Sequence, residues 1–139
     1  MSRVERPVAG TIAEGPWSVL VVENDDAVRS TVVEGLRDSG LRVEAITGAD
    51  RINGWRGDVI VTDTFAMPYR TEEVVAYLKD LQSRFAAGLV LLTGHNGASA
   101  DAAQLPADAV VMKPFDLEDL IAVVTAVARD RHQHGMAKR

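Results

Sequence analysis

The sequence contains no cysteine, and this absence removes several kinds of chemistry at once. Disulfide bonds, thiolate zinc sites and cysteine nucleophiles are all excluded. Long apolar runs are lacking too, since no stretch approaches the roughly 18–20 residues that a membrane-spanning helix needs. Residues 1–16 carry charges, Pro and Gly instead of the apolar core of a secretory signal. We therefore expect a cytoplasmic protein with no membrane partner.

Basic residues are fewer than acidic ones. The chain has 15 Lys and Arg against 20 Asp and Glu, which gives a formal net charge of −5. The basic residues are scattered and no helix-turn-helix-like extension is present, so we expect no nucleic-acid partner. A glycine-rich phosphate loop is also missing after the first apolar run, where residues 23–26 are acidic or amide side chains. This disfavours a nucleotide or cofactor binder built at that position.

Histidine and tryptophan give little indication of a metal or cofactor. The three histidines show no spacing typical of a metal-ligand set, and the two tryptophans are expected to pack in the core or cover loops. These residues are His95, His132, His134, Trp17 and Trp55.

The 139 residues are enough for one domain with a sizeable core. Residues 1–16 read as a loose arm, because Pro and Gly recur in them. Residues 17–129 form the predicted domain. Residues 130–139 are mostly polar and are predicted to be a frayed tail.

Short apolar runs alternate with helical patterns along the domain, which predicts an α/β fold. Strands are predicted at 19–22, 41–46, 59–63, 89–92 and 109–112, and helices at 26–39, 71–85 and 116–129. Residues 95–104 are weakly helical, and the segment 48–57, broken by Gly54, allows a short helix or none. Because most of the strands are almost continuously apolar, we expect a doubly wound parallel sheet with helices on both faces.

Polar side chains follow four of these predicted strands. Glu23, Asp63, Thr93 and Lys113 each end or directly follow one of them. In a parallel sheet the carboxyl ends of the strands meet at one edge, where ligands bind. A carboxylate there can attack phosphorus, oxygen ligands can hold Mg²⁺, and a lysine and a hydroxyl can stabilise phosphoryl oxygens. The pattern therefore indicates a phosphoryl-transfer site.

Four motifs carry a family resemblance. They are VLVVENDDAVR (19–29), DVIVTDTFAMP (58–68), LVLLTGH (89–95) and VVMKPFDLEDL (110–120). In this order and spacing they resemble the receiver domain of two-component response regulators over nearly all of residues 17–128. The resemblance implies a CheY-like, flavodoxin-like sheet with strand order 2-1-3-4-5. It also implies a phosphorelay component that is not an enzyme in its own right.

The resemblance assigns a role to each site residue. Asp63 would accept a phosphoryl group from a histidine kinase or phosphotransfer protein. Thr93 and Lys113 would bind that group, and Pro114 would follow a cis peptide bond. Downstream, an unknown protein would read the surface of residues 95–129, and a homodimer through the last strand and helix stays open. The expected magnesium ligands are Glu23, Asn24 and Asp63, with Asp25 and the Phe65 carbonyl as further candidates.

The chain departs from the family pattern at four places. Asn24 replaces the second acid, Met67-Pro68 lies one residue further from Asp63 than is usual, Val110 replaces an aromatic switch residue, and segment 48–57 is short. The first three departures favour an alternative, a degenerate receiver that binds proteins without being phosphorylated. The short segment implies that the second helix is stunted or missing. Each site residue also has a plainer interpretation: Asp63 as a loop cap, Glu23 or Asp25 as a helix cap, Thr93 as a turn residue and Lys113 as a surface residue.

Overall fold

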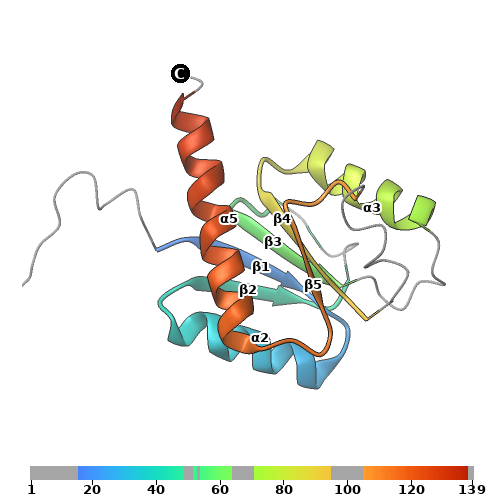
Figure 1. Cartoon of the computed structure of the whole chain (residues 1–139), viewed down its shortest axis with the longest axis vertical. Coiled ribbons are helices and arrows are strands. Elements are labelled where there is room, and N and C mark those ends of the chain that lie inside the picture. The colour runs from blue at the N-terminus through green and yellow to red at the C-terminus, as the bar shows by residue number, and fades with distance from the viewer. Residues whose placement is uncertain (1–15, 49–51, 53, 64–70, 95–104, 138–139) are drawn as a thin grey trace, which may run out of the picture.

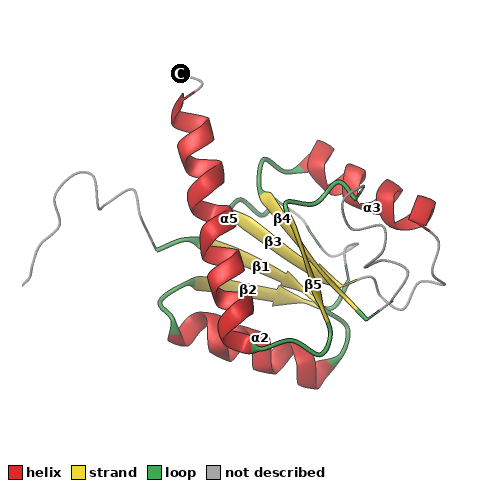
Figure 2. Cartoon of the chain, in the orientation of Figure 1, coloured by secondary structure: helices red, strands yellow, loops and turns green. Residues whose placement is uncertain are grey.

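The protein, analysed as a computed structural model, is a five-stranded parallel sheet with helices on both sides (Figures 1 and 2). The structure describes residues 16–48, 52, 54–63, 71–94 and 105–137. The strand order is β2-β1-β3-β4-β5, which confirms the predicted topology. The strands are β1 (Ser18–Val22), β2 (Arg42–Ile46), β3 (Val59–Asp63), β4 (Gly88–Thr93) and β5 (Ala109–Met112).

Three helices in the described part of the chain cover the sheet. They are α2 (Asp26–Asp38), α3 (Thr71–Arg84) and α5 (Leu117–Ala137). In Figure 1, α2 and α5 lie on one face of the sheet and α3 lies on the other. The predicted fold class, with helices on both faces, is therefore confirmed.

The side-chain alternation of the strands produces two separate cores. Along β3, Val59 and Val61 belong to the core under α2 and α5, while Ile60 belongs to the core under α3. All residues of β3 and β4 are buried, because these central strands are covered on both faces. This burial explains why their sequences are almost continuously apolar up to the polar residue at the end of each strand.

Helix α2 begins and ends where the sequence predicts. The Asp25 side chain caps it by accepting a hydrogen bond from the backbone N–H of Val28 at 3.0 Å. At the other end, Gly40 adopts a positive φ of 96°, a conformation that only glycine reaches without strain.

Helix α5 continues further than predicted. The sequence predicts an end near Arg129 and a frayed tail beyond it, but the helix runs to Ala137. The prediction was wrong because it treated polarity as a sign of fraying. The ring of His132 packs against the buried ring of Trp17, with centroids 5.6 Å apart, so this part of the helix has a partner that comes from the other end of the chain.

The segment between β2 and β3 has no helix among its described residues, 47, 48, 52 and 54–58, as expected for a shortened second helix. Several predictions lie outside the described residues: the arm up to residue 15, Phe65, Met67-Pro68 and the weak helix at 95–104. Within the part that the structure describes, no helix is both long enough and apolar enough to cross a membrane.

Candidate functional site

The predicted site residues meet at the carboxyl edge of the sheet. Asp63 and Thr93 are the last residues of β3 and β4, and Glu23 and Lys113 directly follow β1 and β5. Glu23 is 1% exposed, Asp63 is 7% exposed and Thr93 is fully buried. Buried carboxylates are rare unless they are paired or bind a cation, so their arrangement needs a physical explanation.

Lys113 supplies that explanation for both carboxylates. Its ammonium Nζ donates to Glu23 Oε1 at 3.1 Å and to Asp63 Oδ1 at 3.1 Å. β5 is an outer strand of the sheet, whereas β1 and β3 are inner strands. The long lysine side chain therefore joins three strands at their carboxyl ends. The predicted juxtaposition of Asp63 and Lys113 is therefore observed, and it includes Glu23.

The backbone after β1 fixes the position of Glu23. Its N–H donates to the carbonyl of Ile46 at 3.1 Å, which continues the ladder between β1 and β2. Its Oε2 accepts the N–H of Asp25 at 3.0 Å, and its carbonyl accepts the guanidinium of Arg29 at 2.9 Å. Glu23 is thus held in place from both sides with its carboxylate directed at Lys113.

Burial and neighbouring charges both change the pKa values of Glu23 and Lys113. Burial, assisted by the nearby charge of Asp63, raises the pKa of Glu23 even though the Asp25 N–H and Lys113 oppose the change. Burial alone would lower the pKa of Lys113, but its hydrogen bonds to Asp63 and Glu23 outweigh that effect and raise the pKa. The charged form of Glu23 is therefore held at a cost in free energy, which the ammonium only partly offsets.

The β5–α5 connection places Lys113 beside Thr93. The Lys113 N–H donates to the carbonyl of Thr93 at 2.8 Å, and the peptide bond between Lys113 and Pro114 is cis. The cis bond was expected from the resemblance. A hydroxyl, an ammonium and a carboxylate therefore come from neighbouring strand ends.

The expected magnesium ligands divide into two groups. Glu23 and Asp63 meet at Lys113 and present oxygen atoms at the sheet edge, whereas Asn24 and Asp25 are exposed, and Asp25 is engaged as the cap of α2. No cluster of three or more acidic, histidine or cysteine side chains suited to a metal occurs among the described residues. Two carboxylates fit Mg²⁺, which in proteins commonly takes one or two carboxylates and completes its shell with water and phosphate.

One contact beside the site was not predicted. The Thr62 hydroxyl and the Tyr77 hydroxyl lie 2.7 Å apart, and Thr62 also donates to the carbonyl of Asp63 at 3.1 Å. Tyr77 therefore connects α3 to the strand that carries Asp63. The only signal in the sequence was a hydroxyl directly before Asp63, and that signal does not identify a partner.

Tyr77 should produce a measurable pH dependence of stability. Burial raises the pKa of its phenol from 10.0 to about 12. The folded protein therefore holds this proton more tightly than the unfolded chain, and stability is expected to fall as pH rises from about 10 to about 12, by on the order of 2 kcal/mol. Tyr77→Phe should remove this part of the alkaline loss, as measured by urea unfolding at pH 8 and pH 11. An identical alkaline loss in both proteins would contradict the assignment.

The fold of the chain is that of response-regulator receiver domains. No family model matches the sequence. A receiver protein from Burkholderia phymatum is 25% identical, has a TM-score of 0.65 and is matched over 81% of this chain and 94% of that one. A CheY-like receiver domain from Methanospirillum hungatei JF-1 has a TM-score of 0.68 at 22% identity, with 86% and 99% covered, and shows the same fold.

One curated relative is a larger protein. The DNA-binding transcriptional regulator NtrC of Azospirillum brasilense is 25% identical over 113 residues, which is 77% of this chain and 23% of that regulator. The present chain thus corresponds to less than a quarter of the regulator's length.

Proposed function

We propose that Asp63 accepts a phosphoryl group from the phosphohistidine of a kinase or phosphotransfer protein. The observation that carries this proposal is the bonding of Lys113 to both Asp63 and Glu23 at the carboxyl edge of the sheet. Within the described part of the chain, the second carboxylate oxygen of Asp63, Oδ2, accepts no hydrogen bond. A bond would form from a carboxylate oxygen to phosphorus while the phosphorus–nitrogen bond breaks and its electrons return to the imidazole.

The surrounding residues can stabilise the transferred group. Lys113 places a positive charge next to Asp63, where phosphoryl oxygens would arrive, and Thr93 offers a hydroxyl at the next strand end. Glu23 and Asp63, with Asn24 nearby, would hold Mg²⁺, which when bound neutralises charge on the phosphoryl oxygens. The domain acts here as an acceptor and not as an enzyme in its own right.

Phosphorylation would change the surface by local electrostatics. A phosphoryl group adds about two negative charges beside Lys113 and Thr93. Lys113 leads directly into the connection to α5, so a change in its pairing reaches the surface formed by β5 and α5. We propose that a downstream protein reads this surface.

A beryllofluoride titration tests the site without the covalent step. With Mg²⁺ in millimolar amounts, beryllofluoride should shift amide resonances of Asp63, Thr93 and Lys113 in a saturable way, since it mimics a bound phosphoryl group. Glu23→Gln, which removes one of the two buried carboxylates, should weaken this response by about tenfold or more. Lys79→Gln, an exposed change on α3, is the control and should leave it unaltered. A wild-type spectrum that does not respond would overturn the proposed site.

A second function is favoured by two residues. Asn24 is exposed and brings no charge to the metal ligands, and Val110 packs on the α3 side of the sheet where an aromatic switch residue is expected. The domain would then bind its partner without phosphorylation. In that case Asp63→Asn would leave partner binding unchanged, which a pull-down from the native host would measure.

A further inference from the structure

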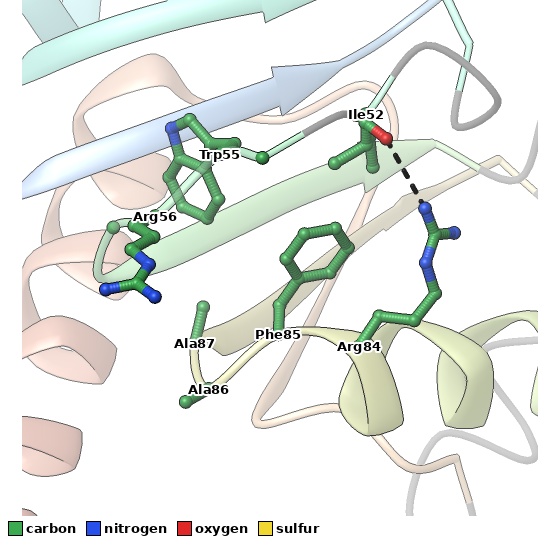
Figure 3. A pocket seen from close by; sticks show the side chains of 9 residues that line it. Ile52, Trp55, Arg56, Arg84, Phe85, Ala86 and Ala87 are labelled. Carbon is green, nitrogen blue, oxygen red and sulfur yellow. Dashed lines mark hydrogen bonds between the residues drawn. The ribbon is translucent and has the colours of Figure 1, made fainter.

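A cavity lies at the opposite edge of the sheet from Asp63. Its volume is about 620 Å³, a size typical of small-molecule sites. It is bounded by the segment before β3 and the segment that joins α3 to β4, at the amino ends of the central strands (Figure 3). Its lining includes Ile52, Trp55, Arg56, Gly57, Arg84 and Phe85.

The aromatic side of this cavity is fixed by close packing. Gly57 has no side chain, and a Cβ there would lie 2.2 Å from Cζ2 of Trp55, so the indole ring rests against the Gly57 backbone. The Trp55 and Phe85 rings meet edge to face with centroids 6.3 Å apart. Two rings held in this way offer a preformed surface on which another flat ring can pack.

The two arginines at the cavity differ in what they already bind. Arg84 forms an ion pair with Asp80 at 3.1 Å, donates to the carbonyl of Ile52 and lies over the Phe85 ring at 5.2 Å. Arg56 is exposed and forms no ion pair or hydrogen bond with the residues that the structure describes. The cavity therefore has one guanidinium that is fixed as part of its wall and one that is available to a ligand.

We propose that this cavity binds a small planar aromatic anion. The ring of the ligand would pack on Trp55 and Phe85, and its carboxylate or phosphate would pair with Arg56 in the two-pronged manner that guanidinium favours. The site shares no residue with the Asp63 edge. Binding should therefore persist in Asp63→Asn.

The test uses the indole N–H signals of the full chain. The sequence has two tryptophans, so Trp55 and the buried Trp17 give two such signals, and Trp17 serves as an internal control. Indole-3-acetate and adenosine monophosphate each carry a ring and an anion. Tryptophol carries the ring alone, and inorganic phosphate carries the anion alone. We expect a saturable shift of Trp55 with at least one of the two ring-bearing anions, and the responding one identifies carboxylate or phosphate as the anionic group.

The variants decide between specific binding and unspecific contact. Arg56→Gln should weaken binding by about tenfold, while Lys79→Gln removes the same charge elsewhere and should leave it unchanged. No saturable shift up to about 10 mM of either anion would overturn the proposal. Equal binding by tryptophol or by inorganic phosphate, or an unchanged affinity in Arg56→Gln, would also overturn it.

Discussion

Asp63→Asn is expected to abolish phosphoryl uptake from a small phosphodonor such as acetyl phosphate with Mg²⁺. The amide keeps the size and shape of the side chain but lacks the carboxylate oxygen that would attack phosphorus. Intact-mass spectrometry should show the gain of one phosphoryl group in the wild type and no gain above background in the variant. The expected effect is a complete loss, because no partial reaction remains when the nucleophile is gone.

The mass measurement needs a control for phosphorylation of other acids near the carboxyl edge. Asp26 is exposed on the first turn of α2 and pairs with Arg29, so it is accessible to a phosphodonor but is not part of the buried cluster. Asp26→Asn should gain the phosphoryl group as the wild type does. Equal mass gain in Asp63→Asn would assign the acceptor to another residue, and no gain in the wild type would favour the phosphorylation-independent module.

Lys113→Met is expected to destabilise the protein more than most single substitutions. It leaves Glu23 and Asp63 buried close together with no cation between them, and an unpaired buried charge is costly. Since the lysine side chain is 25% exposed, we expect a loss of about 2 kcal/mol at pH 8, below the value for a fully buried pair. Urea unfolding monitored by circular dichroism measures this difference.

The pH dependence of that loss follows from the direction of the two pKa changes. The raised pKa of Lys113 means that its contribution is present below about pH 10.5 and is lost as pH rises through the folded-state value. The pKa of Glu23 is also raised, so this acid becomes protonated at a higher pH than an ordinary glutamate. Once Glu23 is neutral, the ammonium of Lys113 stabilises the fold less. The deficit of Lys113→Met should therefore be largest between pH 7 and pH 9 and should shrink toward pH 4.

Two comparisons separate this charge effect from simple loss of packing. Lys113→Arg keeps the positive charge and should lose less stability than Lys113→Met. Added Mg²⁺ should raise the melting temperature of Lys113→Met by more than that of the wild type, because the cation takes over the neutralising role. Wild-type stability of Lys113→Met at pH 8 would contradict the assigned role of the lysine.

The strands and the polar residue at each strand end could be predicted because they depend on local pattern. Apolar runs of three or four residues that lead to Glu23, Asp63, Thr93 and Lys113 indicate both the fold class and the chemical groups of the site. The end of α5 could not be predicted in this way. The residues from Asp130 onward are mostly polar, and the contact of His132 with Trp17 gives this part of the helix a partner in the domain.

The role of Asp25 also required the structure. In the sequence it is one of several adjacent acids, any of which can cap a helix or bind a cation. In the structure its carboxylate accepts the Val28 N–H and so caps α2. The carboxylate of Glu23, whose backbone N–H bonds to Ile46, instead accepts from Lys113. Two acids that lie two residues apart in the sequence thus have different partners in the folded chain.

The sequence by itself determined the α/β class, the alternation of strands and helices that makes the sheet parallel, and which chemical groups lie at the carboxyl edge. Tertiary structure alone decided that Lys113 pairs with Glu23 as well as with Asp63, that Tyr77 bonds to Thr62, and that Trp55 and Phe85 line one cavity. The physical reason is separation along the chain. Hydrophobic periodicity is a property of neighbouring residues, whereas these contacts join segments brought together only by strand register and helix packing.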